Sequence, residues 1–150
     1  MPKLPPKPLV SEVLDAVHKA KTKAKKIEVL QQYDSKALRY CLIWNYDESL
    51  KSALPEGEVP YTPNDAPAGT DHTRLETEYR GLFRFVKGGQ DSLKRTKREQ
   101  MFIQLIEGLS APEAELVCLV KDGKLTSKYK RITKAVIQEA FPQIIWGNRS

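Results

Sequence analysis

The chain has 150 residues, of which 40% are hydrophobic and 29% charged, and its formal net charge is +6 at pH 7. This length suits one domain whose core needs no disulfides, and the composition is typical of a folded, soluble protein rather than a disordered one. The longest apolar runs fall far short of the roughly 20 residues that cross a bilayer. No apolar signal core follows the basic, proline-rich start, so neither membrane insertion nor export is expected.

Helical periodicity predicts three helices in the first third of the chain, and a fourth after them. Pro8 opens the first, Thr22 caps the second, and Asp34 or Ser35 caps the third. A short helix is expected near 48–54, ending at Pro55. The expected inward residues of the first three helices, at helical spacing, are Leu9, Val13, Leu14, Val17, Ala20, Ile27, Leu30, Tyr33, Leu38, Leu42 and Ile43.

Residues 55–72 are rich in Pro, Gly and small polar residues, which predicts a loop too long for a plain connector. Beyond it, two capping boxes, Thr73/Glu76 and Ser110/Glu113, each predict a helix start. Gly88-Gly89, Gly108, Asp122-Gly123 and Pro142 mark the expected helix ends, and a further helix runs from Leu93 or Thr96 to Glu107. The expected inward residues are Leu75, Tyr79, Leu82, Phe83, Val86, Met101, Phe102, Leu105, Ile106, Leu116, Val117, Leu119, Val120, Ile132, Ala135, Val136, Ile137, Ala140 and Phe141.

Together these elements predict an all-α fold, a single compact domain of seven to eight helices. The domain spans 10–146, with a Pro-rich arm at 1–9, the loop at 55–72 and a tail at 147–150. Cys41 and Cys118 lie in apolar stretches and are expected to be buried free thiols. Trp44 is expected in the core, whereas Trp146 either packs against the domain or stays available to a partner.

Basic residues gather at three helix connections or helix starts. Helix N-termini favour anions, so the clusters predict contacts to the DNA phosphate backbone with little sequence preference and a strong salt dependence. A solvated basic surface without a partner is the alternative. The candidate DNA-binding residues are Lys21, Lys23, Lys25, Lys94, Arg95, Lys97, Arg98, Lys124, Lys128, Lys130, Arg131 and Lys134.

No catalytic or metal-binding motif stands out, so a non-enzymatic protein without cofactor or metal is expected. Lys121-Asp122-Gly123 is similar to the Lys-x-Asp-Gly motif of covalent nucleotidyltransferases, but the lysine is one residue too close to the aspartate. A turn with Gly123 in the left-handed conformation is the expected structure. Phosphate-loop, metalloprotease and hydrolase motifs are missing. The acidic pairs 47–48 and 113/115 are expected to complement helix dipoles.

Three segments resemble the N-terminal helical DNA-binding domain of bacteriophage ATP-dependent DNA ligases, a likeness that covers about 10–146. Segment 13–30 has two helices around a lysine-bearing turn, and segment 34–47 is an apolar helix that runs into an aromatic-Asp turn. Segments 109–117 and 132–145 form a helix, a loop and a helix that ends at Phe141-Pro142. The ligase domain grips the minor groove and backbone around a nick. The resemblance therefore implies phosphate contacts from 124–134, with the first basic cluster on the same face, although the basic segment 121–131 is longer than the ligase turn.

The leading functional prediction is a non-enzymatic phage DNA-binding protein, an accessory factor for replication or repair in the cytoplasm of the infected host cell. Its expected partner is double-stranded DNA, nicked or intact. The alternative is a protein-interaction or virion-associated structural protein, whose partner is a replication, transcription or virion protein of phage or host. The arm, the long loop and Trp146 favour this alternative. A third hypothesis is an enzyme fragment that works in trans with a separate nucleotidyltransferase domain.

Overall fold

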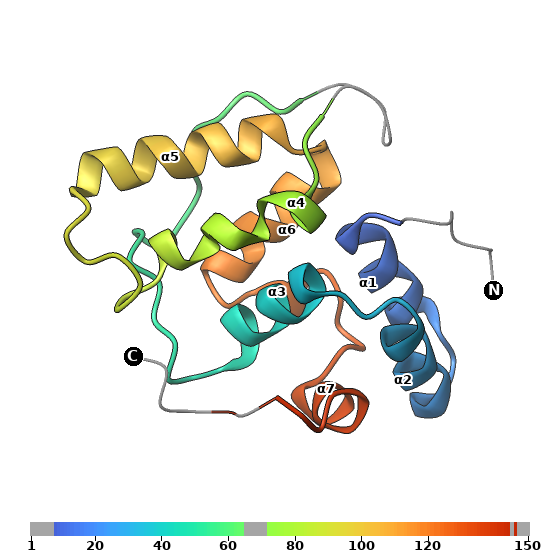
Figure 1. Ribbon diagram of the computed structural model, residues 1–150. Helices are drawn as coiled ribbons and strands as arrows, with labels where there is room; N and C mark the ends of the chain where they lie inside the picture. The colour runs from blue at the N-terminus through green and yellow to red at the C-terminus, as the bar shows by residue number, and fades with distance from the viewer. Residues whose placement is uncertain (1–7, 65–71, 145, 147–150) are drawn as a thin grey trace.

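The computed structural model describes residues 8–64, 72–144 and 146, and within these ranges the protein is a single all-helical domain without strands (Figure 1). This confirms the predicted fold class and the predicted seven to eight helices. The α-helices are α1 (Val10–Lys19), α2 (Lys23–Gln32), α3 (Lys36–Tyr46), α4 (Leu75–Glu78), α5 (Arg95–Gly108), α6 (Ala111–Lys121) and α7 (Lys134–Ala140), and the 3₁₀ segments are η1 (Tyr79–Phe85) and η2 (Leu125–Ser127).

Helix α6 lies at the centre of the domain, where it contacts α1, α3 and α5. Helices α1 and α2 pack together on one side, and α7 packs against α2 (Figure 1). Helix α5 lies at the opposite side, and α4 with η1 forms one rod that runs between α3 and α5. The fully buried side chains include Leu14, Leu30, Leu38, Leu42, Phe102, Leu116 and Phe141.

The first three helices form where the sequence predicts them. The Thr22 hydroxyl accepts a hydrogen bond from the backbone N–H of Lys25 at 3.2 Å, and the Ser35 hydroxyl accepts one from Leu38 at 3.1 Å. Each hydroxyl satisfies one of the N–H groups that a helix start leaves without a partner. Trp44 is buried, as expected, and its indole N–H donates to the Ser52 hydroxyl at 2.9 Å.

The helix expected near 48–54 does not form. The Asp47 carboxylate accepts hydrogen bonds from the backbone N–H and the hydroxyl of Ser49, at 2.9 and 2.7 Å, which bends the chain immediately after α3. The backbone beyond it pairs with the end of the η1 segment, where Ala53 N–H donates to Phe85 C=O at 2.8 Å and Lys51 C=O accepts from Lys87. Asp47 therefore follows one helix instead of starting another, and tertiary backbone pairing replaces the expected short helix.

The loop expected at 55–72 is held at both of its described ends. Residues 55–64 contain no helix, and residues 65–71 lie outside the described part of the chain. Asn64 and Thr73 form bridges to Ser110 and Leu109, which are neighbours at the start of α6. The segment therefore leaves and returns to the same corner of the domain.

The helix expected after Thr73 differs from the prediction in its start and in its type. Thr73 does not cap it, because its backbone N–H donates to Gly108 C=O at 2.7 Å and the N-cap is Arg74. After one α-helical turn the chain continues as the 3₁₀ segment η1, with three residues per turn. That tighter period turns Leu82 and Phe85 inward and leaves Phe83, which was expected inside, 46% exposed.

Ala135, another residue expected inside, is exposed, because the buried face of α7 consists of Val136, Ile137 and Ala140. Helix α7 is capped by Thr133, whose hydroxyl accepts from Val136 N–H at 3.4 Å. Helix α5 buries Phe102 and Ile106 as predicted, whereas Met101 and Leu105 are only half-buried.

Glu113 joins three helices, and it does so differently from the predicted capping box. The Ser110 side chain makes no cap, and the Glu113 side chain reaches away from its own helix start. Its two carboxylate oxygens accept hydrogen bonds from Val10 N–H at 3.0 Å and Leu75 N–H at 3.1 Å. Glu113 is 0% exposed, and this burial raises the pKa of its carboxyl above the ordinary value, while the two backbone hydrogen bonds oppose the rise. One side chain on α6 thus satisfies the first N–H of both α1 and α4.

We expect Glu113→Ala to lower the free energy of unfolding by about 3 kcal/mol or more, because it leaves two buried N–H groups without acceptors. Glu113→Gln retains one acceptor oxygen and should cost less. Urea unfolding followed by circular dichroism measures both values.

Glu115→Ala is the matched control, two residues along the same helix. Glu115 is exposed and lies 3.1 Å from Lys128, in an ion pair of the kind that contributes at most about 1 kcal/mol. Equal destabilisation by the Glu113 and Glu115 substitutions would contradict the role given to Glu113.

Candidate nucleic-acid interface

The first and third basic clusters lie on the same side of the domain. The Arg131 backbone N–H donates to His18 Nδ1 at 3.3 Å, and Lys23 Nζ lies 2.7 Å from Glu139 Oε1 on α7. Helices α2 and α7 pack side by side, which brings the turn between α1 and α2 next to the segment before α7 (Figure 1). We call this region the junction surface, and it consists of Lys21, Lys23, Lys25, Lys128, Lys130, Arg131 and Lys134.

The second basic cluster is not part of the junction surface, because α5 begins at the far end of the molecule from α1 and α2 (Figure 1). Lys94 and Lys97 are exposed there, and Arg95 pairs with Glu99 at 3.3 Å. Arg98 is buried, and its guanidinium donates to the carbonyls of Arg84 and Gln90, both at 2.9 Å. Its hydrogen bonds hold the chain around the start of α5.

The cations of the junction surface differ in whether an acidic side chain pairs with them. Lys21, Lys25, Lys130 and Arg131 are exposed and have no ion pair among the described residues. Lys23 and Lys128 pair with Glu139 and Glu115, but these pairs are exposed and weak. Trp146 is half-buried and packs against the domain. The Lys134 ammonium lies 5.0 Å from the centre of its ring, within the range of a cation–π contact. Lys124 points elsewhere, to Glu56 at 3.4 Å.

Two further lysines near these clusters are structural. Lys26 is buried and donates to the carbonyl of Ala20, at the end of α1. The Lys121 ammonium donates to Pro55 C=O at 2.8 Å, to Gly57 C=O at 3.1 Å and to the Asp122 carboxylate at 2.5 Å. Gly123 has φ +67°, which confirms the predicted left-handed turn. Lys121 therefore anchors the start of the 55–64 segment, and its ammonium is committed to these three partners.

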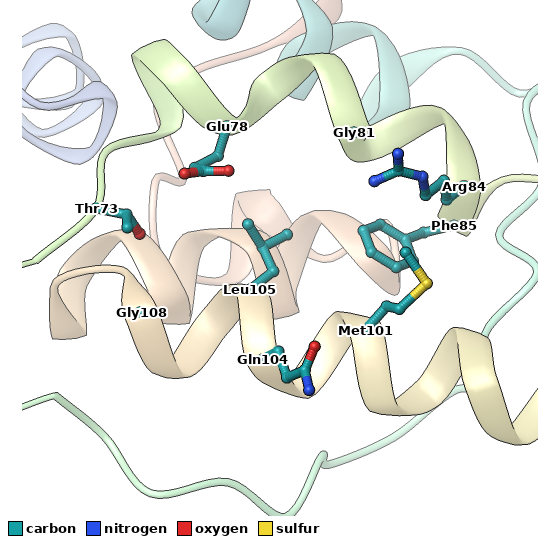
Figure 2. A pocket seen from close by; sticks show the side chains of 9 residues that line it. All are labelled: Thr73, Glu78, Gly81, Arg84, Phe85, Met101, Gln104, Leu105 and Gly108. Atoms are coloured by element: carbon teal, nitrogen blue, oxygen red, sulfur yellow. The ribbon is translucent and has the colours of Figure 1, made fainter.

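A hollow of about 280 Å³ opens between the α4–η1 rod and α5 (Figure 2). Glu78 and Arg84 project into it from the rod, above Leu105, Met101 and Phe85, and Gly81 lies between them. The sequence does not reveal this hollow, because Glu78 and Arg84 belong to no cluster or motif. Among the described residues, no group of three or more His, Cys, Asp or Glu side chains is placed to hold a metal ion.

The described large hydrophobic residues that are exposed, Tyr40 (48%) and Phe83 (46%), both line a second hollow, of about 230 Å³, between α3 and η1. The sequence does not reveal this feature either, because its periodicity places Phe83 inside. We call this hollow the aromatic groove. Its lining residues are Tyr40, Ile43, Trp44, Leu50, Leu82, Phe83 and Val86.

The two cysteines are free thiols, as expected. Burial raises the pKa of Cys41 to about 12 and that of Cys118 to about 11, so both thiols are protonated at neutral pH. Cys41 is fully buried, whereas Cys118 is half-buried. Since the thiolate is the nucleophilic form, neither side chain is an activated nucleophile.

These features define the protein as a small helical domain with an exposed basic surface and several surface hollows, among them the aromatic groove. It belongs to a family of unknown function (DUF6433), whose profile matches residues 13–127, from α1 to η2. No curated protein and no solved structure matches the chain. None of the helices in the described ranges has the length and apolar character needed to cross a membrane.

We expect Lys121→Met to destabilise the protein by roughly 3 kcal/mol, because it leaves the Asp122 carboxylate and two carbonyls without their shared donor. It should also loosen the 55–57 segment and speed its cleavage in limited proteolysis. Urea unfolding and timed proteolysis with mass spectrometry measure the two effects.

Lys124→Met serves as the comparison, because Lys124 is exposed and its contact to Glu56 is weak. Its stability should stay within about 1 kcal/mol of the parent protein. A Lys121 variant as stable and as protease-resistant as the Lys124 variant would show that the buried ammonium does not hold this segment.

Proposed function

We propose that this protein is a non-enzymatic DNA-binding protein that serves phage replication or repair by contacting the duplex backbone through the junction surface. The observation that carries the proposal is the meeting of two basic clusters, around 21–25 and 128–134, that lie far apart in the sequence. The resemblance to the DNA-binding domain of phage ligases supports it, since that likeness implies phosphate contacts from the same two segments.

The chemistry of the junction surface suits phosphate recognition. Lysine ammonium groups act as point charges, and the guanidinium of Arg131 offers two parallel donors to one phosphate. The exposed pairs of Lys23 with Glu139 and of Lys128 with Glu115 cost little to exchange for phosphate contacts. Contacts to phosphates carry no direct sequence information, so the expected binding is tolerant of sequence.

We expect affinity for a labelled duplex to fall steeply with salt, because each cation that neutralises a phosphate releases counterions. The fourfold variant Lys21→Ala, Lys25→Ala, Lys130→Ala and Arg131→Ala should reduce the log–log salt slope by about 0.9 for each phosphate that is no longer neutralised, or up to about 3.6 in all. Fluorescence anisotropy across a salt series, on nicked and intact duplexes of the same sequence, measures the slopes.

The double variant Lys94→Ala and Lys97→Ala is the control, because it removes exposed cations from the far end of the molecule. Its salt slope should match that of the parent protein. Absence of binding at low salt, or an equal reduction in slope per cation in both variants, would refute the junction surface as the DNA site. Tighter binding to the nicked duplex would support a role in repair or replication.

The second candidate function is a protein-interaction or virion-associated structural protein. The observation that favours it is the aromatic groove, because exposed aromatic side chains that gather around one hollow are typical of protein-binding sites. Of the features that favoured this function in the sequence, residues 1–7 of the arm and 65–71 of the 55–72 loop lie outside the described residues, and Trp146 packs against the domain.

A further inference from the structure

The aromatic groove combines an apolar floor with exposed rings. Hydrophobic side chains line it throughout, and Tyr40 and Phe83 stand at its edges, each about half exposed. The rings are held in place, because Tyr40 packs edge-to-face on Tyr79 with ring centres 5.1 Å apart. A pre-ordered apolar hollow of this kind binds an inserted side chain at a low entropic cost.

Three cations lie beside residues of the groove. The Arg80 guanidinium lies 5.8 Å from the centre of the Tyr79 ring, which packs against the groove residue Tyr40. At the end of the groove, next to Leu50 and Val86, Lys51 and Lys87 are joined by a backbone hydrogen bond of 2.8 Å. Within the described part of the chain these three cations have no ion-pair partner, and the residues that line the groove itself are all uncharged.

The arrangement of rings and cations distinguishes between two kinds of partner. A nucleic-acid strand would need open ring faces on which its bases stack. Here each of the two exposed rings has a neighbour beside it: the Arg84 guanidinium lies 5.3 Å from the centre of the Phe83 ring, and the Tyr79 ring packs against Tyr40 at an interplanar angle of 86°. A protein segment needs an apolar pocket for an anchor residue and charges of opposite sign at the rim, which this groove offers.

We propose that the aromatic groove docks an acidic protein segment, which inserts a large apolar side chain between α3 and η1 and pairs its carboxylates with Arg80, Lys51 and Lys87. This inference rests on the second candidate function and is independent of DNA binding. Arginine forms the stronger contacts, since its planar guanidinium binds a carboxylate through two donors while staying stacked on a ring.

Selection from a displayed library of short random peptides tests the proposal. The full-length protein is the bait, and the double variant Tyr40→Asp and Phe83→Asp is the counter-selection. Both substituted side chains are exposed, and circular dichroism checks that the variant keeps its fold. The selected peptides are expected to carry net negative charge around one or two large apolar residues. The best peptide should lose roughly thirtyfold in affinity for the double variant, as expected when aromatic anchors are removed.

The charge requirement is tested separately with Arg80→Gln and Lys87→Gln, which should weaken peptide binding, whereas Lys94→Gln and Lys97→Gln should not. Three results would overturn the proposal: winners without net negative charge, no winners beyond those that also bind the double variant, or a groove that binds an oligothymidine strand in place of peptides. Duplex DNA binding measured on the same double variant should be unchanged. A failure of the groove is thereby distinguished from a failure of the junction surface.

Discussion

The buried carboxylate of Glu113 is the contact on which the arrangement of the helices depends. Burying a charge is costly unless its lone pairs are satisfied, and here two helix N-termini satisfy them. Val10 and Leu75 begin α1 and α4, so the positive ends of both helix dipoles point at one negative group. Because α6 carries this group in the middle of the domain, the position of α6 fixes where α1 starts and where the α4–η1 rod starts. The positions of the junction surface and the aromatic groove therefore depend on Glu113, since α1 leads into the first and the α4–η1 rod forms one wall of the second.

Local sequence determines the first three helices, which form where they are predicted, although α1 has Leu9 as its N-cap and Ile27, Tyr33 and Ile43 are only half-buried. Thr22 and Ser35 cap helices through bonds to residues three positions away, which periodicity and capping rules describe well. The rules fail where a distant segment competes for the same groups. Glu113 accepts hydrogen bonds from Val10, which is 103 positions away in the sequence, and from Leu75, which is 38 positions away. The backbone groups of Lys51 and Ala53 form hydrogen bonds at the end of η1. Nothing local distinguishes the α-helical turn at 75–78 from the 3₁₀ continuation that exposes Phe83, because both bury apolar residues every three or four positions.

The same distinction applies to the candidate site. The sequence identifies the basic clusters, since like charges close in sequence are visible without a fold. It does not show that Lys26, Arg98 and Lys121 are buried, because their burial depends on carbonyl groups that tertiary structure brings to them. Nor does it show which clusters meet, because that follows from the packing of α7 on α2. The sequence therefore identifies where basic residues gather, while their division into one joined surface and one separate group is a property of the fold.

Helix α3 connects the two surfaces for which functions are proposed. Near its start, Tyr40 lines the aromatic groove, and at its end the Tyr46 hydroxyl donates to Ile132 C=O at 2.8 Å, one residue beyond Arg131. Between these points the helix buries Cys41, Leu42 and Trp44, which fix its rotation against the core. Energetic coupling between two sites needs an element with two arrangements whose balance both ligands shift. A continuous helix packed in this way holds the two surfaces at a set separation, so DNA at one and an acidic segment at the other are expected to bind independently.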